Sequence, residues 1–233
     1  MRNKILRIFG YLLLAWPTSL SAVCNAASRR AIPDDNLAYP VLITLKNGST
    51  GSGFYLDADK AVFLVTAKQV IFDPKTNTLN DTSLSLLSYP KEIDSSERNF
   101  LELDLSILNR AVDIKSHPSE DVVLIKVATV VEVQSPKPNA VGETPAPSPS
   151  ATRTQILLLP GVIGKQLSAT GLVGVSLENV ETFDHVLVGN EILMFGYPTS
   201  LSLVPNPKIY FQRSLLRKGI VAGRESYNAF HYS

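Results

Sequence analysis

The stretch from Val41 to Phe72, VLITLKNGSTGSGFYLDADKAVFLVTAKQVIF, decides the fold class of this chain. It alternates short apolar runs with turn residues, as half-buried β-strands do. The pattern predicts three strands, Val41–Leu45, Phe54–Leu56 and Ala61–Val65. Asn47-Gly48 and Gly51-Ser52-Gly53 have the composition of tight turns, and Asp57–Lys60 is expected to form a hairpin turn. Several short strands at this spacing predict an all-β sandwich or barrel.

Further apolar runs continue the pattern on both sides of a Pro-rich stretch. The additional predicted strands are Leu84–Ser88, Leu101–Leu105, Val122–Val127, Gly171–Leu177, Glu191–Phe195, Ile209–Arg213 and Gly219–Ala222. Between these groups lies QSPKPNAVGETPAPSPSATRTQ, which holds five prolines and almost no bulky apolar residue. Such a segment cannot bury enough surface to fold alone and is expected to be a linker or loop.

Composition and charge exclude several classes of function. The chain has 233 residues, of which 45% are hydrophobic and 18% charged, as in globular proteins. A formal net charge of +1 gives no global field that would attract nucleic acid or an anionic membrane. Three histidines without His-x-x-x-His spacing give no zinc signature, and neither a metal nor another cofactor is expected.

The first 26 residues have the three-part pattern of a secretory signal peptide. Arg2, Lys4 and Arg7 precede an apolar run from Ile8 to Trp16, which is too short to span a bilayer as a free-standing helix. Small residues follow, and cleavage is expected after Ala26; a lipoprotein anchor on Cys24, the only cysteine, is the alternative. We therefore expect an exported protein, periplasmic or secreted, with no membrane span and no disulfide in the mature chain.

Two short motifs suggest a site. In FLVTAKQVIF a predicted strand ends at Thr66-Ala67, and the helical turn that follows offers Gln69, whose amide has no basic site. In HPSEDVVLIKV, Asp121 opens an apolar strand, and a carboxylate drawn toward the interior requires a partner. A strand or helix cap would explain Asp121 equally well. Ser52 lacks the spacing of a nucleophile elbow, so a tight turn explains it better.

Taken in order, GSGFYL, VFLVTAKQV, DVVLIKV and ILMFGYP resemble the trypsin/chymotrypsin-like serine protease family, above all its bacterial, disulfide-free members. The resemblance covers roughly residues 40–223 and implies two six-stranded antiparallel barrels with the active site between them. By this resemblance Asp121 matches the triad acid, and Gln69 occupies the position of the triad histidine. The nucleophilic serine has no counterpart, because the sequence contains no Gly-x-Ser-Gly-Gly.

The resemblance divides the chain into four expected segments. They are a signal peptide at 1–26, a complete first β-barrel at 37–132, a Pro-rich linker at 133–155 and a truncated second β-barrel at 156–233. RSLLRKGIVAG, in the last segment, resembles the strand that precedes the nucleophile loop. Gln69 and Asp121 are expected to lie within reach of each other at the cleft between the barrels.

The sequence therefore predicts an exported trypsin-like protein that is catalytically inactive, with a binding role or none at all if the gene is decaying. One alternative is an active serine endopeptidase with an incomplete sequence and an unusual base. Another is a non-enzymatic, β-rich envelope binding protein that only superficially resembles a protease. His117, His185 and His231 are interpreted as surface residues. The expected partner is a polypeptide substrate or another protein.

Overall fold

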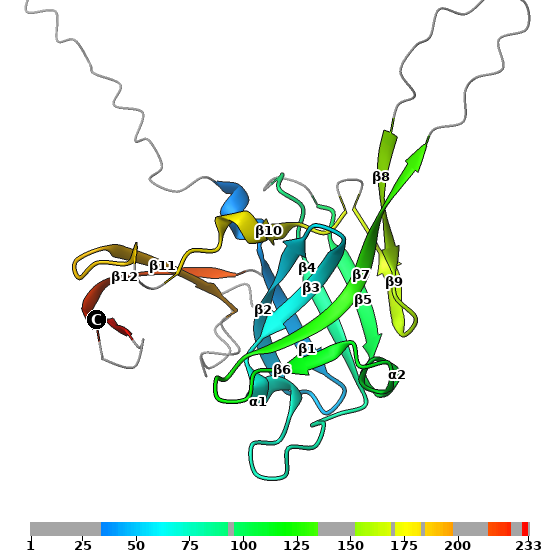
Figure 1. Cartoon of the computed structure of the whole chain (residues 1–233), viewed down its shortest axis with the longest axis horizontal. Coiled ribbons are helices and arrows are strands. Elements are labelled where there is room, and N and C mark those ends of the chain that lie inside the picture. The colour runs from blue at the N-terminus through cyan, green and yellow to red at the C-terminus, as the bar shows by residue number, and fades with distance from the viewer. Residues whose placement is uncertain are drawn as a thin grey trace, which may run out of the picture. The chain divides into compact units, whose positions relative to one another are not determined.

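The architecture comes from a computed structural model, which describes residues 34–92, 96–134, 152–168, 171–182, 185–197, 214–224 and 230–232 (Figure 1). The described residues all belong to one compact unit, Asp34–Ser233. The predicted signal peptide and the predicted strand Ile209–Arg213 lie outside the described residues. No helix among the described residues is long and apolar enough to cross a membrane.

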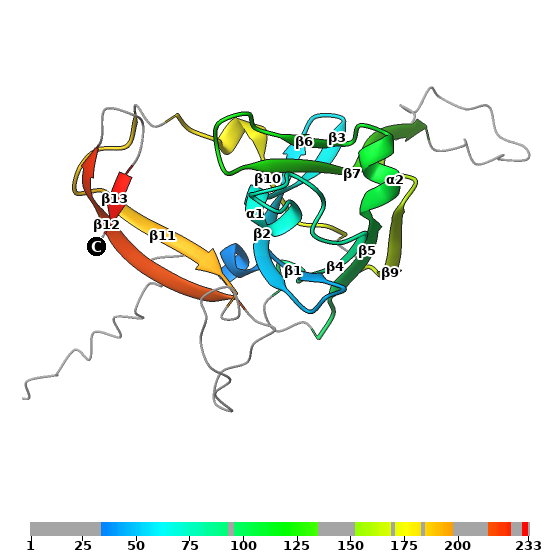
Figure 2. The ribbon, with the colours of Figure 1, turned by 90° about the horizontal axis from the view of Figure 1, so that it is seen from below.

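A strongly curled, mainly antiparallel sheet of ten strands dominates this unit and forms a half-barrel (Figure 2). Its strands are β1 Pro40–Leu45, β2 Thr50–Ala58, β3 Ala61–Thr66, β4 Ser83–Ser88, β5 Asn99–Asp104, β6 Ile114–Ser116, β7 Val123–Gln134, β8 Thr152–Leu158, β9 Val162–Gln166 and β10 Gly174–Ser176. The order is β6-β7-β3-β2-β1-β4-β5-β9, with β8 paired to β7 and β10 paired in parallel to β2.

The remaining elements are short. Two α-helices, α1 Lys68–Ile71 and α2 Leu105–Arg110, and two 3-10 helices, η1 Asp34–Ala38 and η2 Leu177–Asn179, connect the strands. A second sheet consists of β11 Glu191–Gly196, β12 Leu215–Arg224 and β13 Phe230–Tyr232. We call it the C-terminal sheet. In the described part of the chain it shares no ladder with the ten-stranded sheet.

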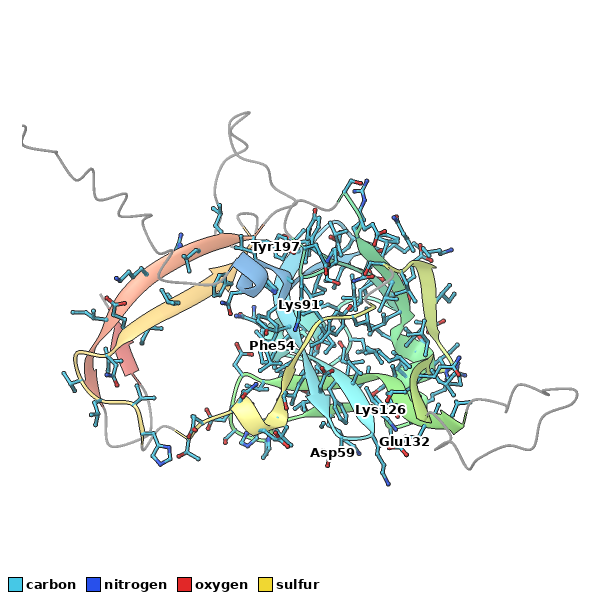
Figure 3. The ribbon with its side chains drawn as sticks, turned by 90° about the horizontal axis from the view of Figure 1, so that it is seen from above. Phe54, Asp59, Lys91, Lys126, Glu132 and Tyr197 are labelled. Carbon is cyan, nitrogen blue, oxygen red and sulfur yellow. The ribbon has the colours of Figure 1, made fainter. Side chains whose placement is uncertain are left out.

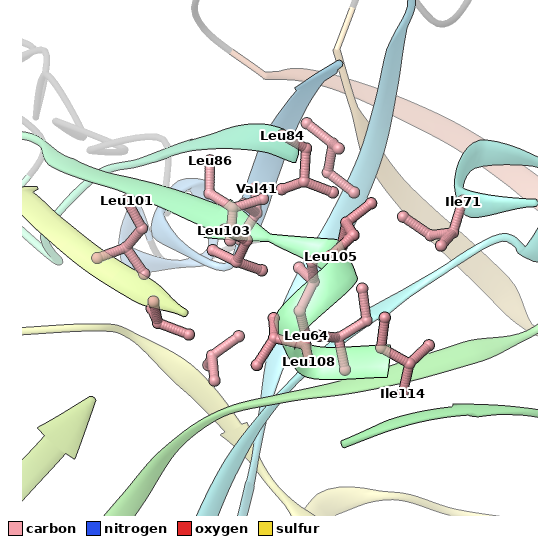
Figure 4. Packing of buried hydrophobic residues seen from close by; sticks show 14 of the residues in the cluster. Val41, Leu64, Ile71, Leu84, Leu86, Leu101, Leu103, Leu105, Leu108 and Ile114 are labelled. Atoms are coloured by element: carbon pink, nitrogen blue, oxygen red, sulfur yellow. The ribbon is translucent and has the colours of Figure 1, made fainter. Parts of the chain in front are cut away.

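Alternation of inward and outward side chains builds the core of the ten-stranded sheet (Figure 4). Buried residues alternate with partly exposed ones in β3 and along most of β5, because successive side chains of a strand point to opposite faces. The buried set from the strands includes Val41, Ile43, Leu45, Val62, Leu64, Leu84, Leu86, Leu101, Leu103, Val123, Ile125 and Val127. Ile71 of α1 and Leu105 and Leu108 of α2 complete it. The predicted strands that this alternation indicated are confirmed.

The predicted turn Gly51-Ser52-Gly53 is wrong, because all three residues lie inside β2. The glycines serve close packing instead. A Cβ atom at Gly53 would lie 2.6 Å from the carbonyl oxygen of Val65, and one at Gly51 would lie 2.7 Å from a methyl group of Val70. The other predicted turns are present: Gly48 adopts φ +87°, and Asp59 adopts φ +44° in the β2–β3 hairpin.

The Pro-rich region differs from the prediction at both ends. β7 continues to Gln134, and β8 begins at Thr152 and pairs with it antiparallel. β8 begins inside the expected linker, and β9 and β10 lie within the segment 156–233 that was expected to form a second barrel, but all three strands belong to the ten-stranded sheet. The predicted strand Gly171–Leu177 is only the three residues of β10. Proline content did not indicate that the strands on either side of this segment pair with each other.

The corner between β8 and β9 joins the two ends of the curled sheet. β8 pairs with β7, and β9 pairs with β5, while only three residues separate β8 from β9. Leu159 N donates to the carbonyl of Val127 at 3.1 Å, and Asp104 N donates to the carbonyl of Gly161 at 2.8 Å. Val162 adds its side chain to the core.

A buried asparagine fixes the segment that leads from β9 to β10. Asn99 is 1% exposed; its Oδ1 accepts from Ser168 N at 2.6 Å, and its Nδ2 donates to the carbonyl of Gly171 at 2.8 Å. Both ends of the side-chain amide are therefore used, as a buried polar group requires.

We predict that Gly53→Ala lowers the free energy of unfolding by about 1–3 kcal/mol, because the new methyl group collides with the backbone of β3. Gly196→Ala is the matched control within a strand, since a Cβ there would meet its nearest neighbour, Ser52 Oγ, at 3.7 Å. Urea unfolding followed by circular dichroism measures both. Equal losses in the two variants would contradict the packing explanation for Gly53.

Candidate functional site

The register of β3 and β7 places Gln69 and Asp121 side by side. The two strands are antiparallel, with Thr66 opposite Val123. One residue, Ala67, separates β3 from α1, and one residue, Val122, separates Asp121 from β7. The chain therefore leaves one strand at the edge where it enters the other. The hydroxyl of Thr66 donates to the carbonyl of Ser52 at 2.9 Å and fixes this end of β3 to β2.

A hydrogen bond joins the two predicted site residues. Gln69 N donates to Asp121 Oδ1 at 3.1 Å across 52 residues of sequence. Ala67, at the N-cap position of α1, offers no side-chain acceptor. The first N–H groups of a helix have no partner within the helix, and a carboxylate near them is favourable. Asp121 therefore supplies from another segment the acceptor that the N-terminus of α1 lacks.

Asn80 holds the opposite side of the same turn. Its Nδ2 donates to the carbonyl of Gln69 at 2.9 Å and to that of Val70 at 3.2 Å, while Asn80 N donates to the carbonyl of Ile71 at 2.9 Å. The last carbonyls of a helix also lack internal partners. Sequence reasoning missed Asn80, since an isolated asparagine in a loop carries no signal of a partner eleven residues away.

Gln69 and Asp121 lie within reach of each other, as expected, but the Asp121 carboxylate is not drawn toward the interior. Both residues are exposed. The strand carries Val123 into the core, whereas Asp121 lies two residues earlier and stays at the surface. Capping therefore explains this carboxylate without a buried partner, and its correspondence to a triad acid stays a prediction.

Two surface pockets meet at Gln69. The first, of about 250 Å³, is lined by charged groups on Lys68, Asp73, Glu120 and Asp121 together with the ring of Phe72. The N–H groups of Thr76 and Lys75 hold the pKa of Asp73 below its usual value, so this carboxylate is ionised near neutral pH.

The second pocket, of about 480 Å³, contains no ionisable side chain. Its polar lining is neutral and comes from Asn47, Ser49, Thr50, Ser52, Gln69 and Asn80. Amides and hydroxyls of this kind donate and accept hydrogen bonds, but they do not take up protons near neutral pH. This pocket is suited to holding neutral polar groups and not to acid–base chemistry.

The histidines whose side chains are described do not contact Asp121. His117 Nδ1 accepts from Glu120 N at 3.0 Å and so closes its own loop. His185 Nδ1 lies 2.6 Å from Glu181 Oε2, with both side chains exposed. The side chain of His231 lies outside the described residues. Within the described part of the chain, no cluster of His, Cys, Asp and Glu could hold a metal ion.

Ser52 has a structural partner. Its hydroxyl accepts a hydrogen bond from Tyr197 N at 3.0 Å, and its carbonyl accepts from Thr66. Neither partner is a base that could activate the hydroxyl as a nucleophile.

Comparison of the chain with protein-family models, with curated proteins and with solved structures finds no match.

We predict that Asp121→Ala lowers the free energy of unfolding by about 0.5–2 kcal/mol, because it removes the cap of α1. Asp121→Asn keeps a carbonyl acceptor and should therefore lower the free energy of unfolding by less than Asp121→Ala does. Glu120→Ala is the control, because among the described residues the Glu120 carboxylate accepts only from the hydroxyl of its neighbour Ser119, at 3.1 Å. Thermal and urea unfolding measure all three, and a neutral Asp121→Ala would rule out the capping role.

A histidine introduced at position 69 should sense the carboxylate of Asp121. In Gln69→His the imidazole pKa should rise above about 6.5, because a nearby negative charge favours the protonated ring. The double variant Gln69→His/Asp121→Asn removes that charge and should return the pKa toward 6.5. Titration of the imidazole signals by NMR gives both values. Identical values would mean that side chains at these two positions do not face each other.

Proposed function

We propose that this chain is an exported protein with a trypsin-like fold that binds polypeptide without cleaving it. One observation carries the proposal: the turn that Asp121 caps presents an amide, at Gln69, where the resemblance places an imidazole. The fold gives further support. Six antiparallel strands in the order β7-β3-β2-β1-β4-β5 share one core, and six is the number that the resemblance implies for each barrel.

The chemistry of Gln69 argues against hydrolysis. A general base contributes about 10²–10⁴ to the rate of such reactions, and an amide cannot take that role. No described imidazole bonds to Asp121, and the hydroxyl of Ser52 already accepts from Tyr197. The 233 residues contain no Gly-x-Ser-Gly-Gly motif that would offer another nucleophile.

The pockets support binding of a polypeptide. Each peptide unit offers one N–H donor and one C=O acceptor, which match the neutral amides and hydroxyls of the larger pocket. The smaller pocket adds carboxylates and an aromatic ring within the same region. Export rests on the signal-peptide pattern of Met1–Ala26 and places this binding in the periplasm or outside the cell.

A non-enzymatic β-rich envelope binding protein is the second candidate. It is favoured by the pairing of β9 and β10 with the ten-stranded sheet, because the resemblance assigned the segment 156–233, which contains both strands, to a separate barrel. Both candidates lack catalytic activity. The second differs from the first only in that its fold does not derive from a protease.

The purified chain should remain unlabelled by a fluorescent fluorophosphonate, which reacts with activated serines, and should leave an unfolded protein substrate intact. A known serine protease labelled in parallel confirms that the probe is reactive. Labelling that disappears on boiling and in Asp121→Ala would overturn the inactive assignment, because it would show an activated serine that depends on this carboxylate.

The binding half of the proposal has its own test. A fluorescein-labelled, chemically unfolded polypeptide should bind the chain, as measured by fluorescence anisotropy. Gln69→Trp, which places a large ring where the two pockets meet, should weaken binding roughly tenfold, equivalent to about 1.4 kcal/mol. Asn109→Trp, at an exposed position of α2, is the control and should bind as the unaltered chain does. Equal affinity in both variants would place the binding surface elsewhere.

A further inference from the structure

Tyr197 follows β11 directly but differs from it in solvent exposure. β11 lies largely at the surface, and Leu193 is 37% exposed, whereas Tyr197 is fully buried. Its ring packs in a cluster with Leu42, Leu87 and Tyr89. These three residues belong to the ten-stranded sheet or follow it directly, so Tyr197 carries the chain from the C-terminal sheet into contact with the other sheet (Figure 3).

Two hydrogen bonds reinforce this apolar contact. The hydroxyl of Tyr197 donates to the carbonyl of Pro40 at 3.2 Å, and its backbone N donates to Ser52 Oγ at 3.0 Å. Pro40 begins β1, and Ser52 lies in β2. A tyrosine in such a position contributes both a large apolar area and a directed polar contact.

The C-terminal sheet is coherent but has little core of its own. Six residue pairs join β11 to β12, and Lys218 Nζ lies 2.6 Å from Glu191 Oε1. Large apolar side chains stay exposed on β12, with Leu216 at 42% and Ile220 at 46%. Small sheets without a buried face are marginal by themselves, and regions with few buried contacts open locally before the rest of a protein unfolds.

We infer that Tyr197 is the anchor that docks the C-terminal sheet on the ten-stranded sheet, and that β11 and β12 detach together when this anchor opens. Detachment uncovers the apolar surface of Leu42, Leu87 and Tyr89. It also releases the hydroxyl of Ser52, which lines the neutral pocket beside Gln69. Because Ser52 belongs both to the anchor and to the lining of that pocket, detachment of the C-terminal sheet changes the pocket wall. This inference does not depend on the proposed function.

Hydrogen–deuterium exchange of the full chain, read by mass spectrometry, tests the anchor. Tyr197→Phe removes the bond to Pro40, and Ser52→Ala removes the acceptor of Tyr197 N. Each should speed exchange in Glu191–Gly196 and in the segment 215–221 by roughly two- to tenfold, as the loss of one hydrogen bond implies. Exchange in β1, β3 and β4 should stay unchanged. Tyr197→Ala should produce a larger increase in the same segments.

Tyr55→Phe is the matched control. Tyr55 is as fully buried as Tyr197, but among the described residues its hydroxyl forms no hydrogen bond to the C-terminal sheet, so its removal should not speed exchange there. If Tyr197→Ala prevents folding, exchange in Tyr197→Phe and in Ser52→Ala tests the inference without it. Unchanged exchange in Tyr197→Phe and Ser52→Ala, or an equal increase in both sheets, would overturn the inference, because either result shows that Tyr197 does not control a local opening.

Discussion

The antiparallel pairing of β3 with β7 is the constraint on which the candidate site depends. Thr66 lies opposite Val123, so the turn that follows one strand and the loop that precedes the other must meet at the same edge of the sheet. A shift of the register by one residue would reverse which side chains enter the core, and this strongly specifies the pairing. The contact between Gln69 and Asp121 is thus fixed by core packing and does not require an attraction between their side chains.

That geometry gives Asp121 two interpretations that do not compete. As a structural residue, it accepts the N–H of Gln69 and completes the N-terminus of a four-residue helix. As the counterpart of a triad acid, it would stand beside whatever side chain position 69 presents. One hydrogen bond supports both, since a carboxylate that caps the turn is also held next to the residue on it. The capping role therefore accounts for this carboxylate without a catalytic explanation.

Sequence periodicity was sufficient to predict the strands that form the core, because apolar residues at every second position of β1, β3 and β4 have one low-energy arrangement. It failed where the determining contact is distant in sequence. The glycines of β2 resemble a turn until the carbonyl of Val65 is seen against Gly53. Asn80 and Tyr197 resemble ordinary loop residues, because nothing in the sequence around them indicates their partners, which lie on α1 for Asn80 and on β1 and β2 for Tyr197. The pairing of β8 with β7 is likewise set by partners across a Pro-rich gap.

The hydrogen bonds at position 69 also explain how a base could be absent without damage to the fold. Asp121 satisfies the backbone N–H of Gln69, and Asn80 satisfies its carbonyl. The exposed side chain adds no hydrogen bond within the described residues. Because the turn is held entirely through the backbone, stability imposes almost no requirement on the side chain there. Any requirement for imidazole would come from chemistry alone, and a chain that performs no proton transfer is free to carry an amide.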